Sequence, residues 1–261
     1  MPTILVINDD GIASVGLVAL KKQLEKLGRV IVVAPKEECS GVGKALTAYG
    51  TIRVLKTKLS DGSEAYAITG TPADAYHMAV NKILKKPPDL VATGINLGPN
   101  LGIDDMFNSG TLGASLEAAI HKIPTIAVSY CMPRLTKKEE KADVTLEKLE
   151  PAASIAKKTV EYVLKNGMPE DVDIISINVP ENAKRKVKVT RLSYKGYGDI
   201  HIKQGNGYKI DGWSLTVYPN DEPETDVHTI KKEKSISVTP IKIALPHKKE
   251  RLKELQDILS A

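Results

Sequence analysis

Two adjacent carboxylates near the N-terminus, Asp9 and Asp10, are the residues most able to do chemistry. They follow residues 4–7, an unbroken run of branched apolar side chains that predicts a strand buried on both faces. The sequence from Asn8 to Gly11 has the composition of a turn. We therefore expect both acids just beyond the carboxyl end of an inner strand, where open α/β sheets bind ligands.

Two such charges about 4 Å apart repel by roughly 4 kcal/mol at an effective dielectric constant of about 20. A bound cation is the simplest way to keep both acids ionised. The alternative is a pair of solvated turn residues without a ligand.

Two other loops offer further oxygen atoms. Ser40 and Asn96 each lie in a glycine-containing loop that follows an expected strand. Carboxylate, hydroxyl and amide oxygens are hard ligands, which suit Mg²⁺ or Mn²⁺ and not a tetrahedral zinc site. The pattern predicts a divalent-cation site, and Asp9, Asp10 and Asn96 are the candidate catalytic residues.

A fourth loop, Ser109-Gly110-Thr111, has the composition of a helix start. Hydroxyl groups and N–H groups at a helix N-terminus can bind phosphate, although an isolated Ser-Gly-Thr is more often a plain helix cap. A metal site beside a phosphate site indicates phosphoryl chemistry. Asn8 and Asn100 are further candidates for orienting water or phosphate, unless Asn8 only caps its turn.

The elements that must position these loops alternate between strand and helix over the first 130 residues. Strands are expected at 4–7, 30–34, 51–55, 65–68, 90–93 and 126–128, and helices at 14–27, 71–84 and 108–119. A further helix is expected at 152–164, after Pro151, and a strand at 174–177. This order predicts an α/β fold with a doubly wound, mostly parallel, Rossmann-like sheet.

The C-terminal part has a different character. A charged excursion is expected at 133–148. Residues 185–235 are β-like and rich in glycine, with strands expected at 187–192, 227–230 and 236–239 and a terminal helix at 248–259. We divide the chain into a catalytic core, residues 1–184, and a β-rich C-terminal arm, residues 185–261, within one structural unit. Residues 185–235 have too few apolar side chains for a core of their own, so we expect them to reach onto a neighbouring subunit.

Composition limits the classes of function. The net charge is +5, from 37 basic and 32 acidic residues, and the lysines are interspersed with acids. This is typical of a solvated surface, so no nucleic-acid partner is expected. Two cysteines are too few for a disulfide framework. The sequence has no apolar run of membrane length, so we expect a cytoplasmic protein without a membrane partner.

Three other classes match the sequence less well. A phosphoacceptor receiver module, a Mg²⁺-binding signalling protein without turnover, needs an acceptor aspartate at the end of a central strand, and residues 50–56 contain none. A haloacid-dehalogenase type enzyme needs Asp-x-Asp where this chain has Asp-Asp. A dinucleotide-binding enzyme needs further glycines after Gly11. A scaffold protein without any turnover is separated from these by a phosphatase assay.

Taken together, the motifs resemble the SurE family of survival-protein phosphatases, which are metal-dependent nucleotidases. The matching residues occur along most of the chain: Asn8-Asp9-Asp10-Gly11, Ala34-Pro35, Ser40-Gly41, Gly70-Thr71-Pro72, Asp74, Gly94-Ile95-Asn96, Gly98-Pro99-Asn100-Leu101-Gly102, Ser109-Gly110-Thr111, Thr225-Asp226 and Ser237-Val238-Thr239-Pro240. The chain departs from the family pattern at Ala13 and Val15, and before Ser237 it lacks the usual glycine.

The resemblance implies one divalent ion per subunit, held by Asp9, Asp10, Ser40 and Asn96. It also implies hydrolysis of nucleoside 5′- and 3′-monophosphates, and a homo-oligomer, either a dimer or a tetramer built from dimers. The general acid is not identified by the sequence, because His77, His121 and His228 are more typical of core, surface and packing roles.

Overall fold

The computed structural model of the chain describes residues 1–132, 143–183, 186–210, 215–244 and 253–260. In these residues, nine strands form one sheet in the order β3-β4-β2-β1-β5-β6-β7-β11-β8. The strands are β1 (Thr3–Ile7), β2 (Arg29–Pro35), β3 (Val54–Lys58), β4 (Glu64–Ile68), β5 (Leu90–Leu97), β6 (Thr125–Cys131), β7 (Ile174–Pro180), β8 (Val187–Val189) and β11 (Ile236–Ile241).

The sheet is parallel from β4 to β7. At its two ends, β3 is antiparallel to β4 and β11 is antiparallel to β7, and β8 runs parallel to β11. The prediction of a doubly wound, mostly parallel α/β sheet is therefore confirmed. Within the described ranges, none of the helices combines the length and apolar character needed to cross a membrane.

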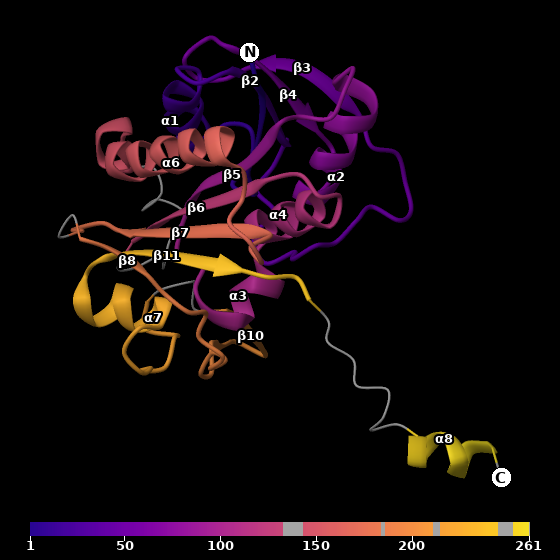
Figure 1. Cartoon of the computed structure of the whole chain (residues 1–261), viewed down its shortest axis with the longest axis vertical. Helices are drawn as coiled ribbons and strands as arrows, with labels where there is room; N and C mark the ends of the chain where they lie inside the picture. Colours follow the sequence, from indigo (N-terminus) through magenta and orange to yellow (C-terminus); the bar gives the residue numbers. More distant parts are fainter. Residues whose placement is uncertain (133–142, 184–185, 211–214, 245–252, 261) are drawn as a thin grey trace.

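Strand β1 lies in the middle of the sheet, and all five of its residues are buried. Its side chains alternate between two cores. Ile4 and Val6 pack with α1 (Val15–Leu24) and α6 (Leu146–Asn166), whereas Leu5 and Ile7 pack with α2 (Pro72–Met78) and α4 (Gly110–Ile120). Figure 1 shows where these four helices lie around the sheet. Helices on both faces explain why the strand shows no polar alternation.

The helices that begin at the carboxyl edge of the sheet have local N-caps. The Ser14 hydroxyl accepts the Gly16 N–H at 3.2 Å at the start of α1. At α2, Thr71 and Asp74 form a capping box, which satisfies two backbone donors reciprocally. These side chains fix where each helix begins, and so fix the loops before them. Helix α2 continues as η1 (Ala79–Ile83).

Three expected elements differ from the structure. The strand expected at 227–230 is wrong: α7 (Asp226–His228) and η2 (Thr229–Glu233) occupy this region. The Thr225 hydroxyl accepts the His228 N–H at 3.1 Å and caps this turn, which overrides the β-branched composition. Helix α6 begins at Leu146, capped by Thr145, with Pro151 inside it. Strand β3 begins three residues later than expected.

The C-terminal region contains two kinds of structure (Figure 1). Strands β8 and β11 extend the main sheet, and Leu215, Tyr218 and Val227 join a buried cluster with Leu101. In contrast, the hairpin of β9 (His201–Gln204) and β10 (Gly207–Ile210) is exposed along its whole length. Residues 185–235 were expected to extend away from the core, but among the described residues of this segment only the β9–β10 hairpin is exposed along its whole length. The division at residue 184 stays a prediction.

Helix α8 (Lys253–Ser260) is the described part of the expected terminal helix. The first residues of that helix, and most of the charged excursion expected at 133–148, lie outside the described residues.

Candidate metal and phosphate site

The loops that follow β1, β2 and α3 (Gly102–Asn108) and the carboxyl end of β5 meet around the acid pair. Asn96 was expected in a loop, but it lies within β5, which continues to Leu97. The Asp9 carboxylate accepts the Thr111 hydroxyl at 2.6 Å, and its backbone carbonyl accepts the Cys39 N–H at 2.7 Å. The Asp10 carboxylate accepts the Leu97 N–H at 2.9 Å. The structure thus brings the acid pair next to the neighbours of both Ser40 and Asn96.

The start of α4 packs directly on Asp9. A Cβ atom at Gly110 would lie 2.7 Å from the Asp9 Cβ and 3.1 Å from the Cys39 carbonyl oxygen, so only glycine allows this approach. The Ser109 hydroxyl caps α4 by accepting the Leu112 N–H at 3.2 Å. The N–H groups of the first helical turn have no partner within the helix, so this terminus is a suitable site for an anion.

Thr111 has a contact that differs from the expected one. Its side chain is fully buried, and its hydroxyl donates to Asp9. In this structure the hydroxyl therefore orients a carboxylate of the acid pair. Its role in binding phosphate stays a prediction, and the backbone N–H is the group of this residue that suits it.

The two remaining members of the expected cation site lie at its rim. Asn96 is half-buried, and its side-chain amide donates to the Gly98 carbonyl at 2.9 Å, which fixes the orientation of its own carbonyl oxygen. Ser40 is exposed, and its hydroxyl donates to Glu38 at 2.7 Å. Both side chains carry an oxygen at the edge of the sheet where the acid pair lies.

Asn8 and Asn100 have structural contacts. Asn8 is fully buried, and its amide donates to the Gly11 carbonyl at 3.2 Å. The Asn100 side chain donates to Ser129 at 2.8 Å, and its backbone exchanges two hydrogen bonds with the Asn178 side chain, of 3.0 and 2.8 Å. Sequence reasoning missed Asn178, although a polar residue within an apolar strand is a usable signal. Their expected roles with substrate stay predictions.

The site is electronegative and lacks a nucleophilic thiol. Burial raises the pKa of the Cys39 thiol, and the Asp9 and Glu38 carboxylates raise it further. In the part of the chain that the structure describes, no three His, Cys, Asp or Glu side chains form a group able to hold a metal. The donor set here is instead two carboxylates with one hydroxyl and one amide oxygen, which fits a hard divalent cation.

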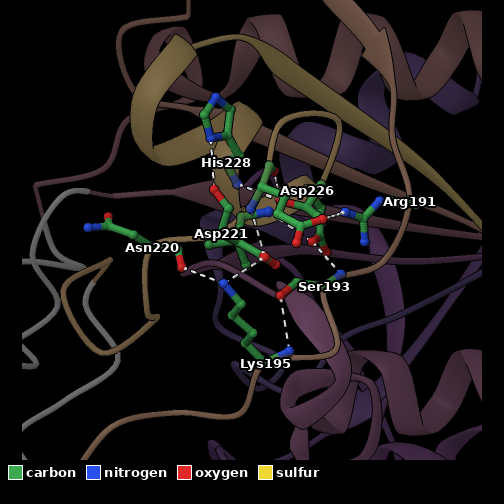
Figure 2. Close-up of polar contacts among 10 residues, drawn as sticks. Arg191, Ser193, Lys195, Asn220, Asp221, Asp226 and His228 are labelled. Carbon is green, nitrogen blue, oxygen red and sulfur yellow. Dashed lines mark hydrogen bonds and ion pairs between the residues drawn. The ribbon is translucent and has the colours of Figure 1, made fainter.

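The histidines considered as general acids make contacts elsewhere. His77 lies 3.0 Å and His121 3.7 Å from the Glu117 carboxylate. His228 contacts the Asp221 carbonyl at 3.0 Å (Figure 2). These contacts are with residues outside the acid pair, so the structure assigns none of the three as the general acid.

The fold and the site together define a doubly wound α/β protein with an oxygen-rich site beside a helix N-terminus. The family model described as Survival protein SurE matches residues 4–199. A protein named 5′-nucleotidase SurE from Methanobrevibacter smithii is 36% identical over 255 residues, which cover 96% of this chain and 98% of that protein. The protein of the same name from Methanothermobacter thermautotrophicus is 40% identical over 202 residues, which cover 77% and 76%.

The crystal structure of the SurE protein from Aquifex aeolicus matches with a TM-score of 0.74 and 32% identity, and the match covers 100% of both chains. The chain belongs to the SurE family, as the resemblance of its motifs predicts.

The contact of Thr111 with Asp9 leads to a first prediction. Thr111→Val keeps the shape of the side chain but removes the donor to a buried carboxylate. We expect Mn²⁺ affinity to fall by about 10- to 100-fold, because a residue that orients a metal ligand has an effect of this size. Calorimetric titration of the protein with Mn²⁺ measures it.

Thr125→Val is the matched control, because it removes an equally buried hydroxyl that donates to the Ile123 carbonyl at the opposite end of the sheet. Equal Mn²⁺ affinity in the two variants would contradict the orienting role of Thr111.

Proposed function

We propose that this protein is a metal-dependent phosphomonoesterase that hydrolyses nucleoside 5′- and 3′-monophosphates to nucleoside and phosphate. One observation carries the proposal: the 2.6 Å contact between Thr111 and Asp9 places a helix N-terminus against an acid pair. The names of the relatives, 5′-nucleotidase SurE, support nucleotides as the substrate class. A receiver-like module without turnover is not favoured, because the matched relatives are named as enzymes.

In this proposal, each subunit holds one Mg²⁺ or Mn²⁺ ion with oxygen atoms of Asp9, Asp10, Ser40 and Asn96. When bound, such an ion polarises the phosphoryl group and provides a water nucleophile at neutral pH. Asp9 is held in place by Thr111, and Asp10 by the Leu97 N–H. Both carboxylates therefore have fixed orientations before any ligand arrives.

The phosphate end of the substrate is assigned to the start of α4. The N–H groups of Gly110 and Thr111, with the Ser109 cap, are placed to stabilise charge on the equatorial phosphate oxygens. Asn8 and Asn100 complete the proposed phosphate-binding set. The Asn8 amide holds its turn through the Gly11 carbonyl, and the Asn100 amide ties its loop to Ser129 of β6, so we assign both residues the shaping of the loops around the phosphate.

Metal dependence gives the second prediction. We expect chelation to abolish activity, and Asp9→Asn or Asp10→Asn to lower kcat by more than about a hundredfold, since the ion contributes several kcal/mol of charge stabilisation. Asp199→Asn, which removes an exposed carboxylate elsewhere, is the control. The assay is hydrolysis of a chromogenic phosphate monoester with and without Mn²⁺. Full activity after dialysis against excess EDTA would rule out the metal assignment.

The surroundings of the site offer little to recognise a base. The chain has one Phe and one Trp. Phe107 precedes the phosphate loop and is 64% exposed, and Trp213 lies outside the described residues. Few aromatic side chains mean weak stacking on a base, so discrimination between bases is expected to be weak. We expect no second anchor for a diester at the phosphate site.

The third prediction concerns substrate range. Purine and pyrimidine monophosphates, with the phosphate at the 5′ or the 3′ position, should all be hydrolysed, and diesters should react poorly. Measuring kcat/KM across such a panel at fixed Mn²⁺ decides this. A preference above about a thousandfold, roughly 4 kcal/mol, for one nucleotide would mean that a base-reading pocket exists.

We also propose that the protein is a homo-oligomer, a dimer or a tetramer of dimers, in the cytoplasm. The exposed β9–β10 hairpin carries apolar side chains into solvent, with Tyr208 74% and Ile210 47% exposed. A hairpin of this kind does not stabilise itself, so a second copy of the chain is its expected partner. Both cysteines are free, which suits a reducing compartment.

The fourth prediction tests this assembly. Light scattering at micromolar concentration should give a mass of two or more subunits, and Tyr208→Ser with Ile210→Ser should shift it to a smaller species. Lys209→Ser, on the same hairpin, should leave the mass unchanged. A wild-type monomer would contradict the proposal.

A further inference from the structure

The Asp226 carboxylate joins three separate segments of the chain. It is 1% exposed, and it accepts the N–H groups of Gly102 at 2.8 Å, Ser193 at 2.9 Å and Val227 at 2.8 Å. Figure 2 shows its side chain directed at Ser193. Among the described residues, no Lys or Arg side chain forms an ion pair with Asp226. Three backbone N–H groups therefore satisfy this buried carboxylate, and the carboxylate in turn fixes the positions of those backbone groups.

Segments 101–103 and 193 also pack backbone against backbone. The Ile103 N–H donates to the Ser193 carbonyl at 2.7 Å. Gly102 has a φ of +67°, and a Cβ atom there would lie 3.2 Å from the same carbonyl oxygen. A left-handed conformation and a close approach both favour glycine at this position. The start of α3 is thus fixed by residues more than 90 positions later in the sequence.

A second buried acid, Asp105, holds the body of α3 to the same region. It accepts the Leu101 N–H at 2.6 Å and the hydroxyl groups of Tyr197 and Tyr218. The pKa of Asp105 is raised to about 7, mainly because the carboxyl group is buried. The three hydrogen-bond donors lower this pKa, and the nearby Asp226 carboxylate raises it further. The rings of Tyr197 and Tyr218 pack edge to face, with centroids 5.5 Å apart.

Helix α3 links this cluster to the phosphate site. It ends at Asn108, directly before the Ser109 cap of α4. The Asn108 carbonyl accepts the Gly43 N–H at 2.8 Å, from the loop that also carries Ser40. A displacement of α3 would therefore move the start of α4.

The metal side of the site is anchored differently. Asn96 and Leu97 belong to β5 and pair with Ser129 and Tyr130 of β6, so the sheet fixes them. Helix α3 is outside the sheet and depends on its side-chain contacts.

We propose that Asp226 and Asp105 are positioning residues, through which the C-terminal segment holds α3 and sets the phosphate-binding loop against the acid pair. This inference rests on the proposed phosphatase function. The Thr225-Asp226 motif does not belong to the proposed metal and phosphate site. In this inference, it supports that site through its contacts with the start of α3. Phosphate binding then depends on the contacts of Asp226 and Asp105, which are not ligands of the proposed divalent ion.

The test compares Asp226→Asn with wild type in three measurements. An amide cannot accept all three N–H groups without placing its own NH₂ against one of them. We expect the KM for a chromogenic phosphate monoester and the Ki of inorganic phosphate to rise by about 10- to 100-fold, as for a misplaced binding group. The Kd for Mn²⁺, titrated without phosphate, should rise clearly less than the KM and the Ki, because β5 holds Asn96 and Leu97 and only the Thr111 contact with Asp9 links the start of α4 to the ion.

Glu222→Gln is the matched control, because it changes an exposed carboxylate of the same segment whose ion pair is with Arg191. Tyr197→Phe is a second test that applies even if Asp226→Asn does not fold. It removes one hydroxyl donor to Asp105 and should raise the same KM and Ki by at least about threefold, with a smaller rise in the Kd for Mn²⁺.

The outcomes separate the two proposals. Wild-type turnover with an unchanged KM and Ki in folded Asp226→Asn, or in Tyr197→Phe, would overturn the positioning role alone. A loss of Mn²⁺ affinity as large as the loss of phosphate affinity would overturn it as well, since it would indicate general distortion of the site. No turnover by the wild-type protein would overturn the proposed function, and the inference with it.

Discussion

Burial of the Asp9 carboxylate at the end of the central strand is the constraint on which the rest of the site depends. A buried charge needs donors, and the Thr111 hydroxyl is one of them. To reach Asp9, α4 must start against the end of β1, and this approach requires glycine at position 110. The position of this helix N-terminus, where we propose that phosphate binds, therefore follows from the need to satisfy a carboxylate.

The same physical demand recurs at the C-terminal side of the site. Asp226 and Asp105 are buried, and their donors come from segments far apart in the sequence. Each acid fixes the backbone that satisfies it. Helix α3 contacts the C-terminal segment at its start and leads into the proposed phosphate loop at its end. Our proposal therefore makes the C-terminal region a support of the site as well as an assembly surface.

Sequence reasoning succeeded where the determining contacts are local. The apolar run 4–7 identified β1 as a buried strand, and Thr71 with Asp74 identified the start of α2. It failed at 227–230, where the Thr225 cap and packing against Leu101 outweigh β propensity. The contact of Thr111 with Asp9 spans 102 positions, and no local pattern encodes such a pair. The four candidate ligands came from the loops after the expected strands and agree with the family resemblance, whereas the 5′/3′ substrate class came from the resemblance alone.

The central claim is that one divalent ion lies among oxygen atoms of Asp9, Asp10, Ser40 and Asn96, beside the start of α4. Anomalous diffraction from crystals grown with Mn²⁺ and inorganic phosphate tests it most directly. The account predicts one strong manganese peak between these four side chains, with phosphate bound at the N–H groups of Gly110 and Thr111. Crystals that contain Mn²⁺ but show no manganese peak between these four side chains would contradict it.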